Sequence, residues 1–322
     1  MDHIRISNDA TYFPVSLTDV MLAAPLVSRV VLGATLPGKV LQLAALGVYA
    51  ASALQDWADR RGVRRIDFLR EFGADVHHLR PMSVAQREEE VGVLARRLNR
   101  EYVALTIPRA QVAETVDRHL TAYIAGITDQ TVETSREVRN FGLVQILFPF
   151  ALGACDYLSG DVAIFRDTGV FEPHVIAHEF SHRKGYYKEL EAQAIAYLAL
   201  TASGDPVLVQ SALCERLHRQ IRVLSDDDEE RFERIAKESG LREELREELL
   251  KLRPRPGRLV RPISNAMRAL YEERMKLTGQ NGISDYDRGF TDFLYTFETS
   301  SHALQTMHAA GRAAGSAASP AG

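Results

Sequence analysis

Residues 172–200 read EPHVIAHEFSHRKGYYKELEAQAIAYLAL. Within this stretch His178 and His182 are four residues apart, and a helix places such positions on one face with their Cβ atoms about 6 Å apart. That separation lets two imidazoles bind one Zn2+ at Zn–N distances of about 2.0–2.1 Å. The pattern His-Glu-x-x-His therefore predicts a metal site, with Glu179 as the general base that acts on a metal-activated water.

The flanking residues favour a helix around the two histidines. Pro173 suits the first helical turn, and Gly185 allows the chain to reverse after the last one. Residues 188–201 are strong helix formers, so a second helix is expected to begin close to the histidines. The third metal ligand should come from its first turn.

Glu189 and Glu191 are the two candidates for that third ligand. Two positions on a helix differ by about 200° of rotation, so both carboxylates cannot face one ion. We predict Glu189, because Glu-x-Glu-Ala resembles the third-ligand helix of several His-Glu-x-x-His peptidase clans. Glu191 is then the alternative ligand, or a carboxylate that orients a histidine N–H. His174 is expected to line the cleft, with a ligand role as its alternative, because a catalytic zinc keeps one position open.

Hydrolysis also needs a donor that stabilises the oxyanion. The candidates are tyrosines, namely Tyr286 and Tyr186, with Tyr157 and Tyr187 as further options. The segment 150–165 alternates apolar residues around Ser159 and Gly160, which predicts two short extended pieces around a turn. Backbone of this kind beside the metal helix would pair with a peptide substrate as an added strand.

The composition excludes several classes of protein. The chain has 322 residues, a hydrophobic fraction of 46% and a formal net charge of −4, which argue against disorder and against a broad basic surface for nucleic acid. Two cysteines, Cys155 and Cys214, exclude a disulfide framework and a four-cysteine zinc site. A single Zn2+ would therefore be held by histidine and carboxylate.

Residues 20–54 form the most apolar block, with only Arg29 and Lys39 charged. The Leu36-Pro37-Gly38-Lys39 turn signal divides it into two pieces of about 15 or 16 residues, shorter than the roughly 20 needed to span a bilayer. We favour two buried core helices joined by a tight turn, with membrane association of residues 20–54 as the alternative. No secretory signal is visible, so we expect a cytoplasmic protein or one attached to the cytoplasmic membrane.

The rest of the chain reads as mainly α-helical, with a small strand element next to the His-Glu-x-x-His helix. Helices are expected at 83–102, 111–127, 205–224, 226–252 and 261–308, and 138–150 reads as strand-like or buried. We divide the chain into an N-terminal helical hairpin region (1–80), a metallopeptidase-like domain (81–308) and a disordered tail (309–322).

Two blocks resemble the bacterial family called domain of unknown function 3810. The first is the run from His178 to Ala199, which is similar to the family's His-Glu-Leu-x-His-x-Lys-Gly, Glu-Asp-Glu-Ala-Asn and apolar Tyr-Leu-Ala pattern, with Gln193 in place of the preferred Asn. The second runs from Met275 to Tyr286 and includes Gly279, Gln280 and Gly282. The resemblance covers roughly residues 80–300. It implies a zinc metallopeptidase-like protein of gluzincin type, in a family that usually carries N-terminal membrane helices.

The sequence therefore predicts a zinc-dependent metallopeptidase that acts on a peptide or protein. The alternative is a non-catalytic, membrane-associated or regulatory zinc-binding protein. A metal-dependent hydrolase of another amide or ester is a third reading. No nucleic-acid partner is expected.

Overall fold

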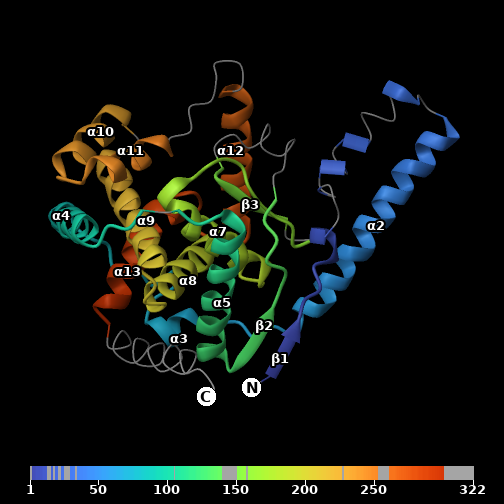
Figure 1. Ribbon diagram of the computed structural model, residues 1–322, viewed down its shortest axis with the longest axis horizontal. Coiled ribbons are helices and arrows are strands. Elements are labelled where there is room, and N and C mark those ends of the chain that lie inside the picture. The colour runs from blue at the N-terminus through green and yellow to red at the C-terminus, as the bar shows by residue number, and fades with distance from the viewer. Residues whose placement is uncertain are drawn as a thin grey trace.

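Helix α7 (Glu172–Arg183) lies inside the molecule with the other elements arranged around it (Figure 1). The computed structural model describes residues 2–12, 16, 19–20, 23–24, 30–32, 35–104, 106–139, 151–156, 159–226, 228–252 and 261–300. All twelve residues of α7 are buried. Helices α5, α8 and α9 pack directly on it, and a small hairpin closes a further side.

Eleven α-helices make up most of the described chain, which confirms the mainly α class. In chain order they are α2 (Leu36–Arg60), α3 (Phe68–Phe72), α4 (Val84–Arg100), α5 (Arg109–Thr128), α7, α8 (Glu189–Ala202), α9 (Pro206–Ser225), α10 (Glu229–Glu238), α11 (Glu243–Lys251), α12 (Arg261–Leu277) and α13 (Phe290–Glu298). Short turns η1 (Asp9–Tyr12) and η2 (Gly169–Phe171) and the π-helix η3 (Asp285–Gly289) complete the helical set in this part of the chain.

Two small sheets accompany the helices. Strand β1 (Asp2–Arg5) pairs in parallel with β2 (Gln130–Glu133), with Asp2 opposite Gln130. Strand β3 (Gly153–Cys155) pairs antiparallel with β4 (Val162–Ile164), with Ala154 opposite Ala163. The β3–β4 hairpin lies against α7, so the predicted strand element beside the metal helix is confirmed.

The end of α7 is fixed by two charged side chains with no exposed surface, Arg183 and Lys184. The Arg183 guanidinium donates to the carbonyls of Ser135 (2.6 Å), Glu137 (2.8 Å) and Gly160 (2.6 Å). The Lys184 ammonium donates to the carbonyl of Val132 (3.0 Å) in β2 and forms an ion pair with Asp117 (2.8 Å) in α5. A buried charge needs such partners, and these attach the end of α7 to β2, to the loop of the β3–β4 hairpin and to α5.

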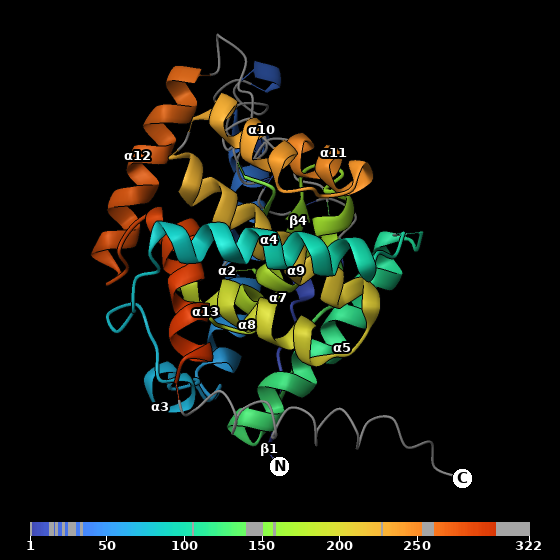
Figure 2. The same cartoon turned by 90° about the vertical axis from the view of Figure 1, so that its left-hand side faces the viewer.

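Most of the helices expected from the sequence are present at the expected places. Ser83 caps α4 through a capping box with Gln86. Helix α9 runs across the core beneath α4 (Figure 2), and α10 packs on it as well. The region expected to be helical from 261 contains two helices, because α12 is followed by Gly279 and Gly282, which both have positive φ. Residues 140–150 and the expected tail at 309–322 lie outside the described residues.

The expectation of two buried helices joined at 36–39 is wrong. Pro37 lies in the first turn of α2, which continues for 25 residues to Arg60. Proline is as compatible with a helix start as with a turn. Large apolar side chains of α2 are exposed, at fractions from 43% to 75%, and they are Leu36, Val40, Leu41, Leu43, Leu46, Val48, Leu54 and Trp57. Figure 1 shows α2 extending away from the helical body.

None of the helices in the described ranges combines the length and the apolarity needed to cross a bilayer. Helix α2 is the longest of them. The three-part division of the chain at residues 80 and 308 stays a prediction.

Candidate metal centre

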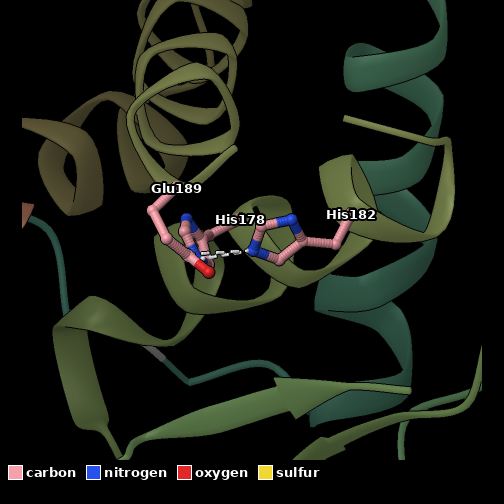
Figure 3. A group of neighbouring side chains, drawn as sticks. All are labelled: His178, His182 and Glu189. Atoms are coloured by element: carbon pink, nitrogen blue, oxygen red, sulfur yellow. Dashed lines mark hydrogen bonds and ion pairs between the residues drawn. The ribbon is translucent and has the colours of Figure 1, made fainter. Parts of the chain in front are cut away.

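Three side chains on α7 and α8 direct one donor atom each toward a common point (Figure 3). His178 Nε2 and His182 Nε2 are 3.1 Å apart. Glu189 Oε2 lies 3.2 Å from His178 Nε2 and 3.1 Å from His182 Nε2. All three residues are buried. This group could hold a metal ion.

The distances and the donor atoms both fit a small divalent cation. Ligands at about 2.0–2.1 Å from a tetrahedral ion are separated from one another by about 3.3 Å, which is close to the spacing of the three atoms. The Tyr186 carbonyl lies 2.6 Å from His182 Nδ1 and can only accept, so Nδ1 carries the proton and Nε2 of the neutral ring is an acceptor. Acceptors that face one another in a buried place need a cation or a proton between them.

The pKa shifts of Glu189 and His182 also show that these groups favour a positive charge between them. Burial would raise the pKa of Glu189, but His182 and His178 outweigh it and hold the pKa well below the usual range. Burial would lower the pKa of His182, but Glu189 outweighs it and raises the pKa. The raised pKa of His182 means that its ring binds a proton more tightly than a free imidazole does, and a metal ion that binds there competes with that proton.

The local sequence explains how the three donors meet. The i, i+4 spacing puts both imidazoles on one face of α7. Gly185 then reverses the chain at φ 104°, where a Cβ would also lie 3.1 Å from the Arg65 guanidinium. Helix α8 begins at once, and the backbone N–H of Glu189 donates to Gln280 Oε1 at 2.7 Å. Gln280 thus satisfies an N–H at the start of α8 that has no partner within the helix.

Glu179 lies beside the group, 6% exposed and next to strand β3. Its Oε1 is only 2.9 Å from the position that a Cβ on Gly153 would occupy. Burial raises the pKa of Glu179, and the neighbouring His178 and His182 oppose the rise. The carboxylate is therefore a stronger proton acceptor than an exposed glutamate.

The structure separates Glu191 and His174 from the three donors. Glu191 forms an ion pair with Lys188 at 3.3 Å and does not belong to the group. His174 is 1% exposed, its backbone N–H donates to Ser211 Oγ at 3.0 Å, and its Nε2 has no hydrogen-bond partner. Burial lowers the pKa of His174 to about 4, so the ring is neutral at pH 7.

The tyrosines named from the sequence have different surroundings. The Tyr286 ring lies 6.2 Å from the His178 ring, at the metal group. The Tyr186 hydroxyl points instead toward the Arg64 carbonyl at 3.5 Å. The contact of Tyr186 with the group is made by its backbone carbonyl, which accepts from His182 Nδ1. Tyr187 packs against Arg65, and Tyr157 lies outside the described residues.

Three residues at the site were not identified from the sequence. Tyr271 on α12 donates a hydrogen bond to Glu189 Oε1, and Gln280 and Gly153 make the contacts described above. Gln280 belongs to the second block that resembles the family, and that resemblance was the one feature of the sequence that could have identified it. Tyr271 precedes that block, and Gly153 reads only as a turn residue.

Comparison with protein families gives one match. Residues 168–295 match the model of a family described as protein of unknown function (DUF3810). The matched segment contains the three donors, Tyr271 and both blocks noted in the sequence, but not the resemblance expected upstream from residue 80. The family description assigns no activity. No curated protein and no solved structure matches the chain.

We expect His178→Ala and His182→Ala each to weaken zinc binding by more than about 100-fold, because each removes one of three donors. The measurement is a chelator competition titration on purified protein. Affinity should also fall as the pH is lowered, because the proton on His182 competes with the metal.

Glu191→Gln is the matched control, since it changes a glutamate in the same turn of α8. It should leave the zinc affinity unchanged. Equal loss in the Glu191 variant and the histidine variants would contradict the assignment of the donors.

Proposed function

We propose that the protein is a zinc-dependent metallopeptidase in which His178, His182 and Glu189 hold the metal. The observation that carries this proposal is a set of three convergent donors among the described residues, with a buried carboxylate, Glu179, beside them. Among the described residues no fourth histidine, cysteine or carboxylate joins the group. An open fourth position is typical of catalytic zinc, whereas structural zinc sites are closed by four protein ligands.

The roles of the protein groups follow from their positions. Zinc, when bound, polarises a carbonyl and lowers the pKa of water toward about 7. Glu179 takes a proton from the attacking water and delivers it to the leaving amine. Its burial next to Gly153 keeps bulk water away and preserves its basicity.

Tyr286 is the proposed oxyanion donor. Its ring lies beside His178, and its hydroxyl is 3.2 Å from the Tyr271 hydroxyl. To donate to a substrate oxygen, the Tyr286 hydroxyl would turn away from Tyr271. Tyr186 is not retained in this role, because its hydroxyl points to Arg64.

The outer edge of β3 supports a peptide as the substrate. The Phe165 N–H donates to the Leu152 carbonyl and the Asp156 N–H donates to the Asp161 carbonyl, so the even-numbered residues of this strand face β4. The backbone groups of Gly153 and Cys155 then face the opposite edge, where no backbone partner occurs in the described part of the chain. An extended peptide can pair there, next to Glu179.

We expect Glu179→Gln to retain zinc and to lose hydrolysis of a peptide library by about 100-fold or more, because the proton acceptor is removed while the ligands remain. Peptide turnover and zinc content would be measured on the same sample. Undiminished turnover would refute the role of Glu179, and absence of turnover in the parent protein would favour a non-catalytic zinc protein.

A second substitution tests the contact between Gly153 and Glu179. Gly153→Ala would place a Cβ 2.9 Å from Glu179 Oε1 and 3.0 Å from the Ala163 carbonyl, so we expect turnover to fall at least about tenfold with zinc retained. Gly47→Ala is the control, because nothing lies within 4 Å of its added Cβ. Equal turnover in the two variants would show that Glu179 does not depend on Gly153.

We further propose that α2 associates with a lipid surface. Six of its eight exposed large apolar residues, all except Leu41 and Val48, lie within about 120° of the helix circumference. An apolar stripe of this kind lets a helix lie on a lipid surface. Arg61, Arg64 and Arg65 follow the apolar part and are exposed, so they could contact anionic headgroups. This association is compatible with a peptidase and with a non-catalytic zinc protein.

Flotation with vesicles that contain phosphatidylglycerol measures this association. We expect the protein to float, and the double variant Leu43→Glu, Leu46→Glu to remain mostly in the dense fraction, because two charges would enter the apolar surface. Leu277→Glu is the control, since Leu277 is 87% exposed on another helix. Flotation of the double variant to the same extent would contradict the proposal.

A further inference from the structure

The two oxygens of the Glu189 carboxylate have different partners because Tyr271 binds one of them. Its hydroxyl donates to Oε1, while Oε2 faces both imidazoles at 3.1–3.2 Å. Tyr271 belongs to α12 and Gln280 follows that helix, and both form hydrogen bonds with Glu189. A distant part of the chain therefore reaches the third donor directly.

The direction of the hydrogen bonds follows from the groups involved. An ionised carboxylate only accepts, so Tyr271 must donate its single proton to Glu189. The Tyr286 hydroxyl, 3.2 Å from that of Tyr271, must then be the donor of the pair. The result is a chain of donation from Tyr286 through Tyr271 to Glu189, in which the Tyr271 hydroxyl has one defined orientation. Tyr286 would leave this chain when it donates to a substrate oxygen.

We infer that Tyr271 is a positioning residue that keeps Glu189 as a ligand through one oxygen only. The inference rests on the proposed metal site. A carboxylate can bind a metal through one oxygen or two, and the second mode would occupy the position that water or substrate needs. A hydrogen bond to Oε1 holds that oxygen away from the ion, so the fourth position stays open.

The hydrogen bond from Tyr271 orients the Glu189 carboxylate from α12, outside its own helix. Glu189 is the first residue of its helix, where side chains have few neighbours from the preceding turn. Gln280 fixes its backbone N–H and Tyr271 fixes its carboxylate, and both residues come from the segment after α11. The donor is thus held at its two ends by groups distant in the sequence.

Tyr271→Phe removes only the hydroxyl and tests the inference without using activity. We expect the dissociation constants for Zn2+ and Co2+ to rise about 10–100-fold, as is typical when the partner of a metal ligand is lost. The visible absorption of the Co2+ form should also weaken, because a two-oxygen Glu189 raises the coordination number above four. Circular dichroism would verify that the variant is folded.

A double variant tests whether Tyr271 affects metal binding through Glu189. Tyr271→Phe combined with Glu189→Gln should bind Co2+ no more weakly than Glu189→Gln alone, because Tyr271 acts through that carboxylate. Tyr295→Phe is the matched control, since the Tyr295 hydroxyl accepts from Gln86 and lies outside the metal group. It should bind both metals like the parent protein.

Two results would overturn the inference, and they separate it from the proposed function. An unchanged Co2+ spectrum and unchanged affinities in Tyr271→Phe, with metal binding lost in His178→Ala, would remove the role of Tyr271 and leave the metal site intact. Additive losses in the double variant would show that Tyr271 acts by another route. A parent protein that binds neither metal would overturn the proposed function itself.

Discussion

The complete burial of α7 is the constraint on which the rest of the structure depends. A helix with this many ionisable groups can be buried only if each charged group finds a partner, because an unpaired charge in the interior costs several kcal/mol. Glu172 pairs with Arg109 of α5 at 2.8 Å, and Arg183 and Lys184 bind carbonyls of the β2 region and of the hairpin loop. The two imidazoles are paired by the carboxylate of Glu189, an arrangement of acceptors that a cation completes.

The partners come from many parts of the chain, which explains why the helices are arranged as they are. Helix α5 supplies Asp117 and Arg109. Strand β3 has Gly153 where a side chain would collide with Glu179. The segment after α11 supplies Tyr271 and Gln280. The matched family segment, 168–295, contains the donors and the α12 contacts but excludes β3. Glu179 therefore lies against a strand outside the matched segment.

The parts of the fold and site that depend on local geometry could be predicted from the sequence. The spacing of His178 and His182 and the reversal at Gly185 follow from local helix geometry. Helix rotation also shows that only one of Glu189 and Glu191 can face the histidines, and the choice of Glu189 came from the resemblance of Glu-x-Glu-Ala to the third-ligand helix of other His-Glu-x-x-His peptidase clans. Contacts that depend on packing could not be predicted, as Tyr271 shows, because 82 residues separate it from Glu189. The sequence did not predict the start of α2 at Leu36, because a proline such as Pro37 is typical of turns and of helix starts alike. The exposure of α2 depends on tertiary packing, which the local sequence does not determine.

The parallel pairing of β1 with β2 has a consequence for the order in which the protein folds. More than a hundred residues separate the two strands, and pairings between such distant segments form slowly because a long loop must close first. Contacts between helices that are adjacent in the chain, such as α7, α8 and α9, close short loops, so we expect them to form before β1 docks. Lys184 donates to the Val132 carbonyl of β2, so the strand on which β1 docks is also the strand that holds the end of α7.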